Sequence, residues 1–197
     1  MKFLAALMLL SLSSAYAESI VGQTADYILD KDPKRTMSMI KSGTVKATIR
    51  NFLPASQRYE VDIAYKMNVS LMGIYEGSQS NPFEKEFFTP EFLENLRKNG
   101  FYNGAYFKAK HRGYADTKTL NGKFYKHCDV VFLYDLQEPP PLLDGIADIL
   151  GIRGGMQDMT ALVHIYPGIP VLGAVKIDVA GKYSGMKIKA GGDYVGP

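Results

Sequence analysis

The chain has 197 residues, with 23 Lys and Arg against 20 Asp and Glu and a formal net charge of +3. Because its basic residues are scattered among acidic ones, the sequence lacks the dense basic cluster that tracks a phosphate backbone, and we expect no nucleic-acid partner. A chain of this length is long enough to bury the core of one ordinary domain and too short for two full ones.

The first 17 residues have the three parts of a bacterial-type secretory signal peptide. Lys2 precedes an apolar run over residues 3–10, and the small residues Ala15 and Ala17 come directly before a cleavage site. The apolar run is shorter than the roughly 20 residues that a membrane-spanning helix needs. We therefore expect cleavage after Ala17 and a periplasmic or secreted protein, in which residues 18–197 form a single β-rich globular domain.

Cysteine and histidine carry little evidence for chemistry. Cys128 is the only cysteine, so no disulfide can form within the chain. His127 beside it would be the base for a thiolate nucleophile, but neighbours on a strand point to opposite faces, so we expect both to be structural. His111 and His164 have no partner at metal-ligand spacing. The sequence thus predicts no catalytic residue, metal site or cofactor. An enzyme whose site assembles from distant residues remains an alternative without a specific feature in its support.

In chain order, the first element is a short helix over residues 20–29, predicted from the spacing of its apolar residues and ended by Asp32-Pro33. In residues 57–75 the odd positions from Tyr59 onward are mostly apolar, and the even positions from 60 to 70 are mostly polar, which predicts a strand with one wet face. Strands are usually five or six residues long, so this one should bend or break, at Asn68 or Gly73. Residues 44–53 should pair with it as a hairpin through residues 54–57.

The remaining elements follow from turn residues and caps. Residues 78–82 have the composition of a loop. Thr89 and Pro90 begin a helix that Asn99-Gly100 ends. Strands over residues 104–114 and 123–136 are joined by a hairpin turn at Asn121-Gly122. A short helix is expected over residues 142–150, and three more strands over residues 159–166, 171–179 and 182–190.

Together these elements predict an α+β, mainly β fold. We expect a curved antiparallel sheet or open barrel of about seven to nine strands, with two or three short helices packed on it. In architecture this resembles the half-barrel lipoprotein and lipid carriers of bacterial envelopes, and the likeness is one of fold alone.

The aromatic and methionine side chains on the predicted apolar strand faces favour an adaptable cavity. The candidate ligand-binding residues are Tyr59, Ile63, Tyr65, Met67, Leu71, Phe124, Phe132 and Tyr134. They predict an exported, soluble envelope protein that binds a lipid or other apolar small molecule in the cavity of a curved sheet, and peripheral contact with a membrane is compatible with that hypothesis. If the same side chains fill an ordinary core, the alternatives are an exported structural or interaction protein without a small ligand, or a small outer-membrane β-barrel.

Overall fold

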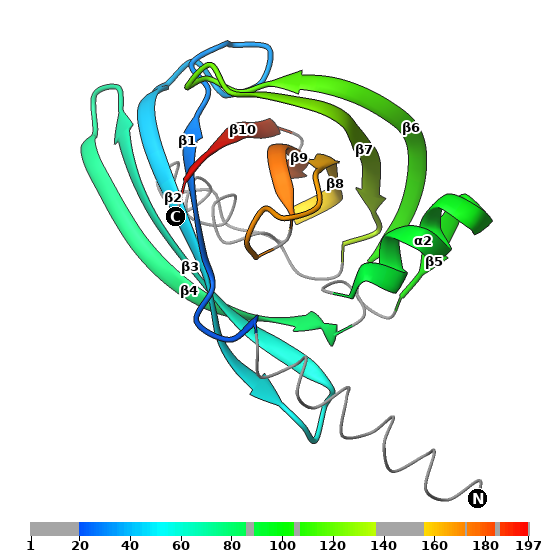
Figure 1. The fold of residues 1–197 in the computed structure, drawn as a ribbon. Helices are drawn as coiled ribbons and strands as arrows, with labels where there is room; N and C mark the ends of the chain where they lie inside the picture. Colours follow the sequence, from blue (N-terminus) through cyan, green and yellow to red (C-terminus); the bar gives the residue numbers. More distant parts are fainter. Residues whose placement is uncertain are drawn as a thin grey trace, which may run out of the picture.

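The computed structural model describes residues 20–85, 89–104, 107–136, 156–171, 173–183 and 186–196. The predicted leader and the predicted helix over residues 142–150 lie outside these ranges. Within them, ten strands form one antiparallel sheet in the order β4-β3-β2-β1-β10-β9-β8-β7-β6-β5. The sheet is strongly curved, with β2 to β4 on one side and β6, β7 and α2 on the other (Figure 1). It is not closed, so β4 and β5 are its two edges. The predicted mainly β, curved antiparallel fold is confirmed.

The strands are β1 (Thr24–Leu29), β2 (Ile40–Leu53), β3 (Arg58–Val69), β4 (Gly73–Glu84), β5 (Phe101–Asn103), β6 (Lys108–Lys118), β7 (Phe124–Tyr134), β8 (Met156–Ile165), β9 (Ala174–Tyr183) and β10 (Met186–Gly196). The described residues contain a single α-helix spanning several turns, α2 (Pro90–Asn99). The prediction of seven to nine strands was therefore too low, and that of two or three helices too high for the described part of the chain.

The predicted helix over residues 20–29 is wrong, because most of this segment is strand β1. Ala25, Tyr27 and Leu29 are buried while Ile28 is 39% exposed, so burial alternates with period two. β1 forms ladders on both sides, with β2 and with β10, and these hydrogen bonds outweigh the local helical spacing. Through β1, Tyr27 and Tyr194 lie opposite each other, with ring centroids 6.0 Å apart.

The long alternating segment is a hairpin rather than one strand. β3 ends at Val69 and β4 begins at Gly73, and both Leu71 (φ 69°) and Gly73 (φ 80°) have left-handed backbone in the turn between them. β4 then pairs with β3 along its whole length, up to Glu84 opposite Arg58. Residues 78–82 are therefore strand and not the predicted loop. Their polar composition reflects an exposed edge strand.

Helix α2 follows its predicted boundaries. Thr89 is the N-cap, Pro90 is in the first turn, and Gly100 ends the helix with φ 76° and its N–H on the Leu96 carbonyl at 2.8 Å. Phe92 and Leu96 are 5% and 1% exposed. The helix lies beside β5 and β6 (Figure 1), so its apolar stripe covers this end of the sheet.

A bulge in β7 decides which of its side chains are buried. His127 has φ 57°, and the ladder with β6 gains a residue here, since Tyr125 and Cys128 lie opposite Thr117 and Ala115. Beyond this bulge Val131 and Leu133 are buried, whereas Phe132 and Tyr134, which were predicted on an apolar strand face, are only half-buried.

One hydrophobic core runs along one side of the sheet, which we call the core face; the other side is the second face. Core-face side chains under 9% exposed include Tyr27, Ile49, Tyr59, Val61, Met67, Val131, Val163, Ile188 and Tyr194. Cross-strand register places Ile28, Thr44, Lys66 and Glu76 in one row on the second face, which continues to Asp193.

Candidate functional site

The β3 members of the predicted ligand site lie mostly within the packed core. Tyr59 and Met67 are each 1% exposed. Ile63 and Tyr65 are half-buried and pack against the same core, and Tyr65 stacks on Tyr75 with centroids 6.1 Å apart. Leu71 is instead fully exposed, at the turn between β3 and β4.

The β7 members lie elsewhere. Phe124 is 56% exposed at the start of β7. Phe132 and Tyr134 lie on the second face and stack on each other at 5.9 Å, with the Arg112 guanidinium 5.1 Å from the Phe132 ring and the Lys110 ammonium 5.5 Å from the Tyr134 ring. The structure therefore does not bring the eight predicted residues together around one space.

A groove crosses β1 to β4 and has a volume of about 710 Å³. On the second face it has short side chains at its centre, Thr44, Ala64 and Ser78, together with the half-exposed Ile28. Its full lining is Asp26, Tyr27, Ile28, Thr44, Val45, Lys46, Ala64, Tyr65, Lys66, Glu76, Gly77, Ser78 and Val195. Tyr65 is the only predicted site residue among them. Gly77 has no side chain because the Tyr65 ring lies over it, 2.6 Å from the place of a Cβ.

Charged groups flank this groove unevenly. Lys66 forms an ion pair with Glu76 at 3.2 Å. Lys46 lies opposite Asp26 in the ladder, yet among the described residues no carboxylate comes within ion-pair distance of its ammonium. Lys46 also lines an adjoining hollow of about 310 Å³, together with Arg50 and Asp62. Among the described residues, the Lys46 ammonium therefore lies without an ion-pair partner where the two hollows meet.

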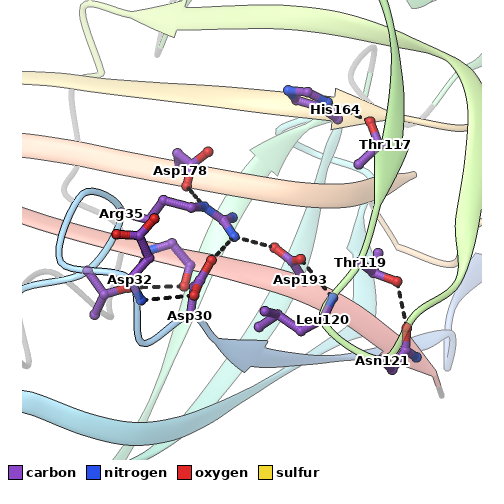
Figure 2. Close-up of polar contacts among 12 residues, drawn as sticks. Asp30, Asp32, Arg35, Thr117, Thr119, Leu120, Asn121, His164, Asp178 and Asp193 are labelled. Atoms are coloured by element: carbon purple, nitrogen blue, oxygen red, sulfur yellow. Dashed lines mark hydrogen bonds and ion pairs between the residues drawn. The ribbon is translucent and has the colours of Figure 1, made fainter.

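A buried charged cluster lies beside the groove on the second face of β9 and β10. Arg35, in the segment between β1 and β2, contacts Asp30 at 2.5 Å, Asp178 at 2.6 Å and Asp193 at 2.8 Å (Figure 2). The Asp193 carboxylate also accepts the Leu120 N–H at 3.0 Å, at the tip of the β6–β7 hairpin. Arg35 therefore joins the segment between β1 and β2 to strands β9 and β10, and Asp193 extends the link to the β6–β7 hairpin.

The electrostatics of this cluster are those of a fixed structural network. Burial alone would lower the pKa of Arg35, but the Asp178 and Asp193 carboxylates raise it. Burial alone would raise the pKa of Asp30, yet hydrogen bonds from the Asp32 N–H and Arg35 hold it below its usual range. Gly191 leaves room for the cluster, because a Cβ there would come within 2.6 Å of Asp178 Oδ1 and 2.9 Å of Arg35 Cβ. Three carboxylates thus share the single Arg35 cation, and the buried Arg35 Nη2 has no hydrogen-bond partner among the described residues.

A second buried carboxylate ties helix α2 to the sheet. Asp129 is 1% exposed and accepts two hydrogen bonds from Arg97, at 2.7 and 2.6 Å, while His111 Nε2 lies 2.9 Å from it. Burial would raise the pKa of Asp129, but these partners lower it. Tyr114 packs against His111 and stacks on His127 at 3.9 Å.

Cys128 is fully buried, and its thiol faces the Tyr125 carbonyl oxygen at 3.7 Å. Burial raises the pKa of the thiol, which disfavours the reactive thiolate. His164 contacts Thr117 Oγ1 through Nδ1 at 2.7 Å (Figure 2), and burial with the nearby Lys176 charge lowers its pKa.

Among the described residues, no three His, Cys, Asp or Glu side chains are grouped so that they could hold a metal ion. In the same ranges no helix has the length and apolar character needed to cross a membrane. Comparison of the chain with protein-family models, with curated proteins and with solved structures found no match.

Sequence reasoning missed the groove because it is formed by even positions of residues 57–75, which had been assigned to a wet face. The signal that could have revealed the groove is the small size of its side chains. Ala64 and Ser78 are short residues directly opposite each other in the β3–β4 hairpin, and short side chains on adjacent strands leave a hollow on a twisted sheet.

Proposed function

We propose that this protein is an exported envelope protein that binds an amphipathic, lipid-like molecule in the groove across β1 to β4. The observation that carries the proposal is the groove itself. Its volume of about 710 Å³ falls within the roughly 300 to 1,000 Å³ of small-molecule sites.

The lining of the groove supports an amphipathic ligand. Ile28, Ala64 and Val195 offer apolar surface along it, and the burial of an acyl chain there would remove apolar area from water. Lys46, which has no ion pair in the described chain, is placed to attract an anionic head group. This differs from the sequence-based hypothesis, in which the aromatic core face held the ligand.

A second candidate, an exported structural or interaction protein without a small ligand, is favoured by a different observation. Tyr59, Val61 and Met67 are at most 1% exposed, so this part of the core face is filled by its own side chains.

Ligand binding separates the two candidates. Lipids extracted from the purified protein would be identified by mass spectrometry, and the displacement of an apolar fluorescent dye would be titrated. Ala64→Trp fills the centre of the groove from an exposed position, so we expect dye affinity to fall by about tenfold or more. Lys46→Glu should weaken binding of anionic amphiphiles more than of neutral ones.

The matched control is Glu60→Trp, which adds the same ring to the same face of β3 outside both hollows. It should leave dye binding unchanged. If no lipid co-purifies and no dye is displaced, or if both tryptophan variants behave alike, the second candidate replaces the first.

A further inference from the structure

The turn between β3 and β4 carries an unusual concentration of exposed apolar side chains. Leu71 is 107%, Ile74 67% and Met72 57% exposed, and these are the three most exposed large hydrophobic residues in the described part of the chain. They occupy one end of the sheet, at the upper left of Figure 1. Single exposed apolar residues are ordinary, but a group on one turn indicates contact with an apolar partner.

The backbone of this turn gives no reason for a leucine. Leu71 has φ 69°, a region that glycine or asparagine adopts more readily than leucine. The turn is closed by backbone groups alone, with the Met72 N–H on the Val69 carbonyl at 3.2 Å and the Ser70 N–H on the Met39 carbonyl at 2.8 Å. The Leu71 side chain therefore serves neither the turn nor the core.

The residues behind the turn form a polar and aromatic layer. Lys41 is exposed at the start of β2, between the residues that pair with Val69 and Asn68, and has no ion pair among the described residues. Lys66 is also exposed, although Glu76 partly offsets its charge. The stacked rings of Tyr65 and Tyr75 lie at the same depth. The turn thus has apolar side chains at its tip, with cations and tyrosines next to them. Proteins that bind at a lipid bilayer interface have their side chains in this order.

The turn is continuous with the groove. Ile74 lies on the same face of β4 as Glu76 and Ser78, both of which line the groove. Its ladder partner is Asn68, one position along the face from Lys66. On this face of β4, Ile74 thus follows Glu76 on the side of the groove nearest the turn.

We propose that the β3–β4 turn docks the protein on a phospholipid bilayer that contains anionic lipid. Leu71, Met72 and Ile74 enter the outer hydrocarbon layer, while Lys41 and Lys66 face the lipid phosphates. The bilayer then supplies the lipid that enters the groove past Ile74, a step that rests on the proposed function. The docking itself does not depend on that function.

The test uses the exported, processed protein and vesicles of phosphatidylcholine with a minor fraction of phosphatidylglycerol. Vesicle partitioning is measured by co-sedimentation. Replacing Leu71→Asn and Met72→Ser together should weaken partitioning by about tenfold or more, since each buried apolar side chain contributes on that scale. Asn suits the left-handed position, so the turn is kept.

Phe124→Ser is the matched control, because Phe124 is 56% exposed near the other hairpin turn; it should leave partitioning unchanged. The docking proposal is overturned if the wild-type protein does not bind vesicles, or if both variants lose binding equally. It is also overturned if the double variant abolishes a concentration-dependent self-association while vesicle binding is absent.

Dye binding without vesicles separates this proposal from the proposed function. The double variant should bind dye as the wild type does, and Ala64→Trp should lose dye while it still binds vesicles. Failure of dye binding alone would overturn the groove ligand and leave the docking turn standing.

Discussion

Two regions on the second face of the sheet differ in whether other segments cover them. Over β9 and β10 this face is covered by the segment containing Arg35 and by the tip of the β6–β7 hairpin, which Asp193 joins through hydrogen bonds and ion pairs. Over β2 to β4 the same face is an open groove. The two regions meet where Asp193 lies opposite Ile28.

The difference shows what covering a polar sheet face requires. On β9 and β10, one arginine contacts two carboxylates, Asp178 and Asp193, and the absence of a side chain at Gly191 leaves room for it. β2 to β4 carry charged side chains too, but these remain solvated, and no loop is anchored across them in the described chain. Because this region is open, its apolar side chains are available to a ligand. The region is for the same reason less stable than a fully buried one would be.

Removal of Arg35 should have the largest effect on the difference between the two regions. Arg35→Met leaves Asp178 and Asp193 without their cation, and Asp193 has a side chain only 2% exposed. We expect the free energy of unfolding to fall by about 3–5 kcal/mol, the cost of an uncompensated buried charge. Urea titration measures it. Arg50→Ala removes an exposed pair with Asp62 and should cost less than about 1 kcal/mol; equal losses would refute the structural role of the cluster.

Gly191→Ala should have the next largest effect. The added methyl group would stand 2.6 Å from Asp178 Oδ1 and 2.9 Å from Arg35 Cβ, so the arginine must move off the sheet. Overpacking of this kind costs about 1–3 kcal/mol. Thermal unfolding would show it. The control is Gly192→Ala, whose nearest contacts are 3.7 Å away, and a similar loss there would contradict the crowding described for residue 191.

The covered region should also make stability depend on pH through His164. Its pKa is lowered by burial and by Lys176, with Arg35 adding to the effect and Asp178 and Asp193 opposing it. The unfolded chain therefore takes up a proton near pH 6.5 at which the folded protein does not, so stability decreases as pH falls below that value. His164→Gln should flatten this dependence, as followed by urea midpoints across the range. An unchanged slope would exclude His164 as its source.

The smallest effect is expected in the open region. Leu71→Gly removes a left-handed leucine, worth about 1–2 kcal/mol, but adds about 0.5–1 kcal/mol of unfolded-chain entropy. The free energy of unfolding should stay the same or rise by about 1 kcal/mol. Calorimetry would detect it, and a clear loss of stability would mean that Leu71 packs on something within the fold.

Local signals in the sequence were sufficient for much of the fold. The hairpin turns at residues 54–57 and 121–122 and the boundaries of α2 were predicted from Pro, Gly and capping residues. β1 was not, since its conformation is decided by ladders with β2 and β10 that lie far away in the sequence. Phe132 and Tyr134 were predicted on an apolar face of β7, but a single left-handed residue, His127, shifts the alternation, and Val131 and Leu133 are buried instead.

The sites were harder to predict than the fold. The members of the Arg35 cluster come from residues 30 to 193, so no spacing in the sequence connects them. The groove depends on short side chains. A sequence pattern indicates which residues are present, but it does not indicate where short residues leave space. The signal peptide and the export that it implies stay predictions.

The position of β10 has a consequence for the order of assembly. β10 lies at the centre of the sheet, between β1 and β9, and it is the last strand in the chain. Until it is made, β1 to β4 and β5 to β9 have no ladder between them, and joining them needs contacts of very long sequence separation, which form slowly. Completion of the sheet is therefore a late step in the assembly of the described strands, because β10 links its two halves.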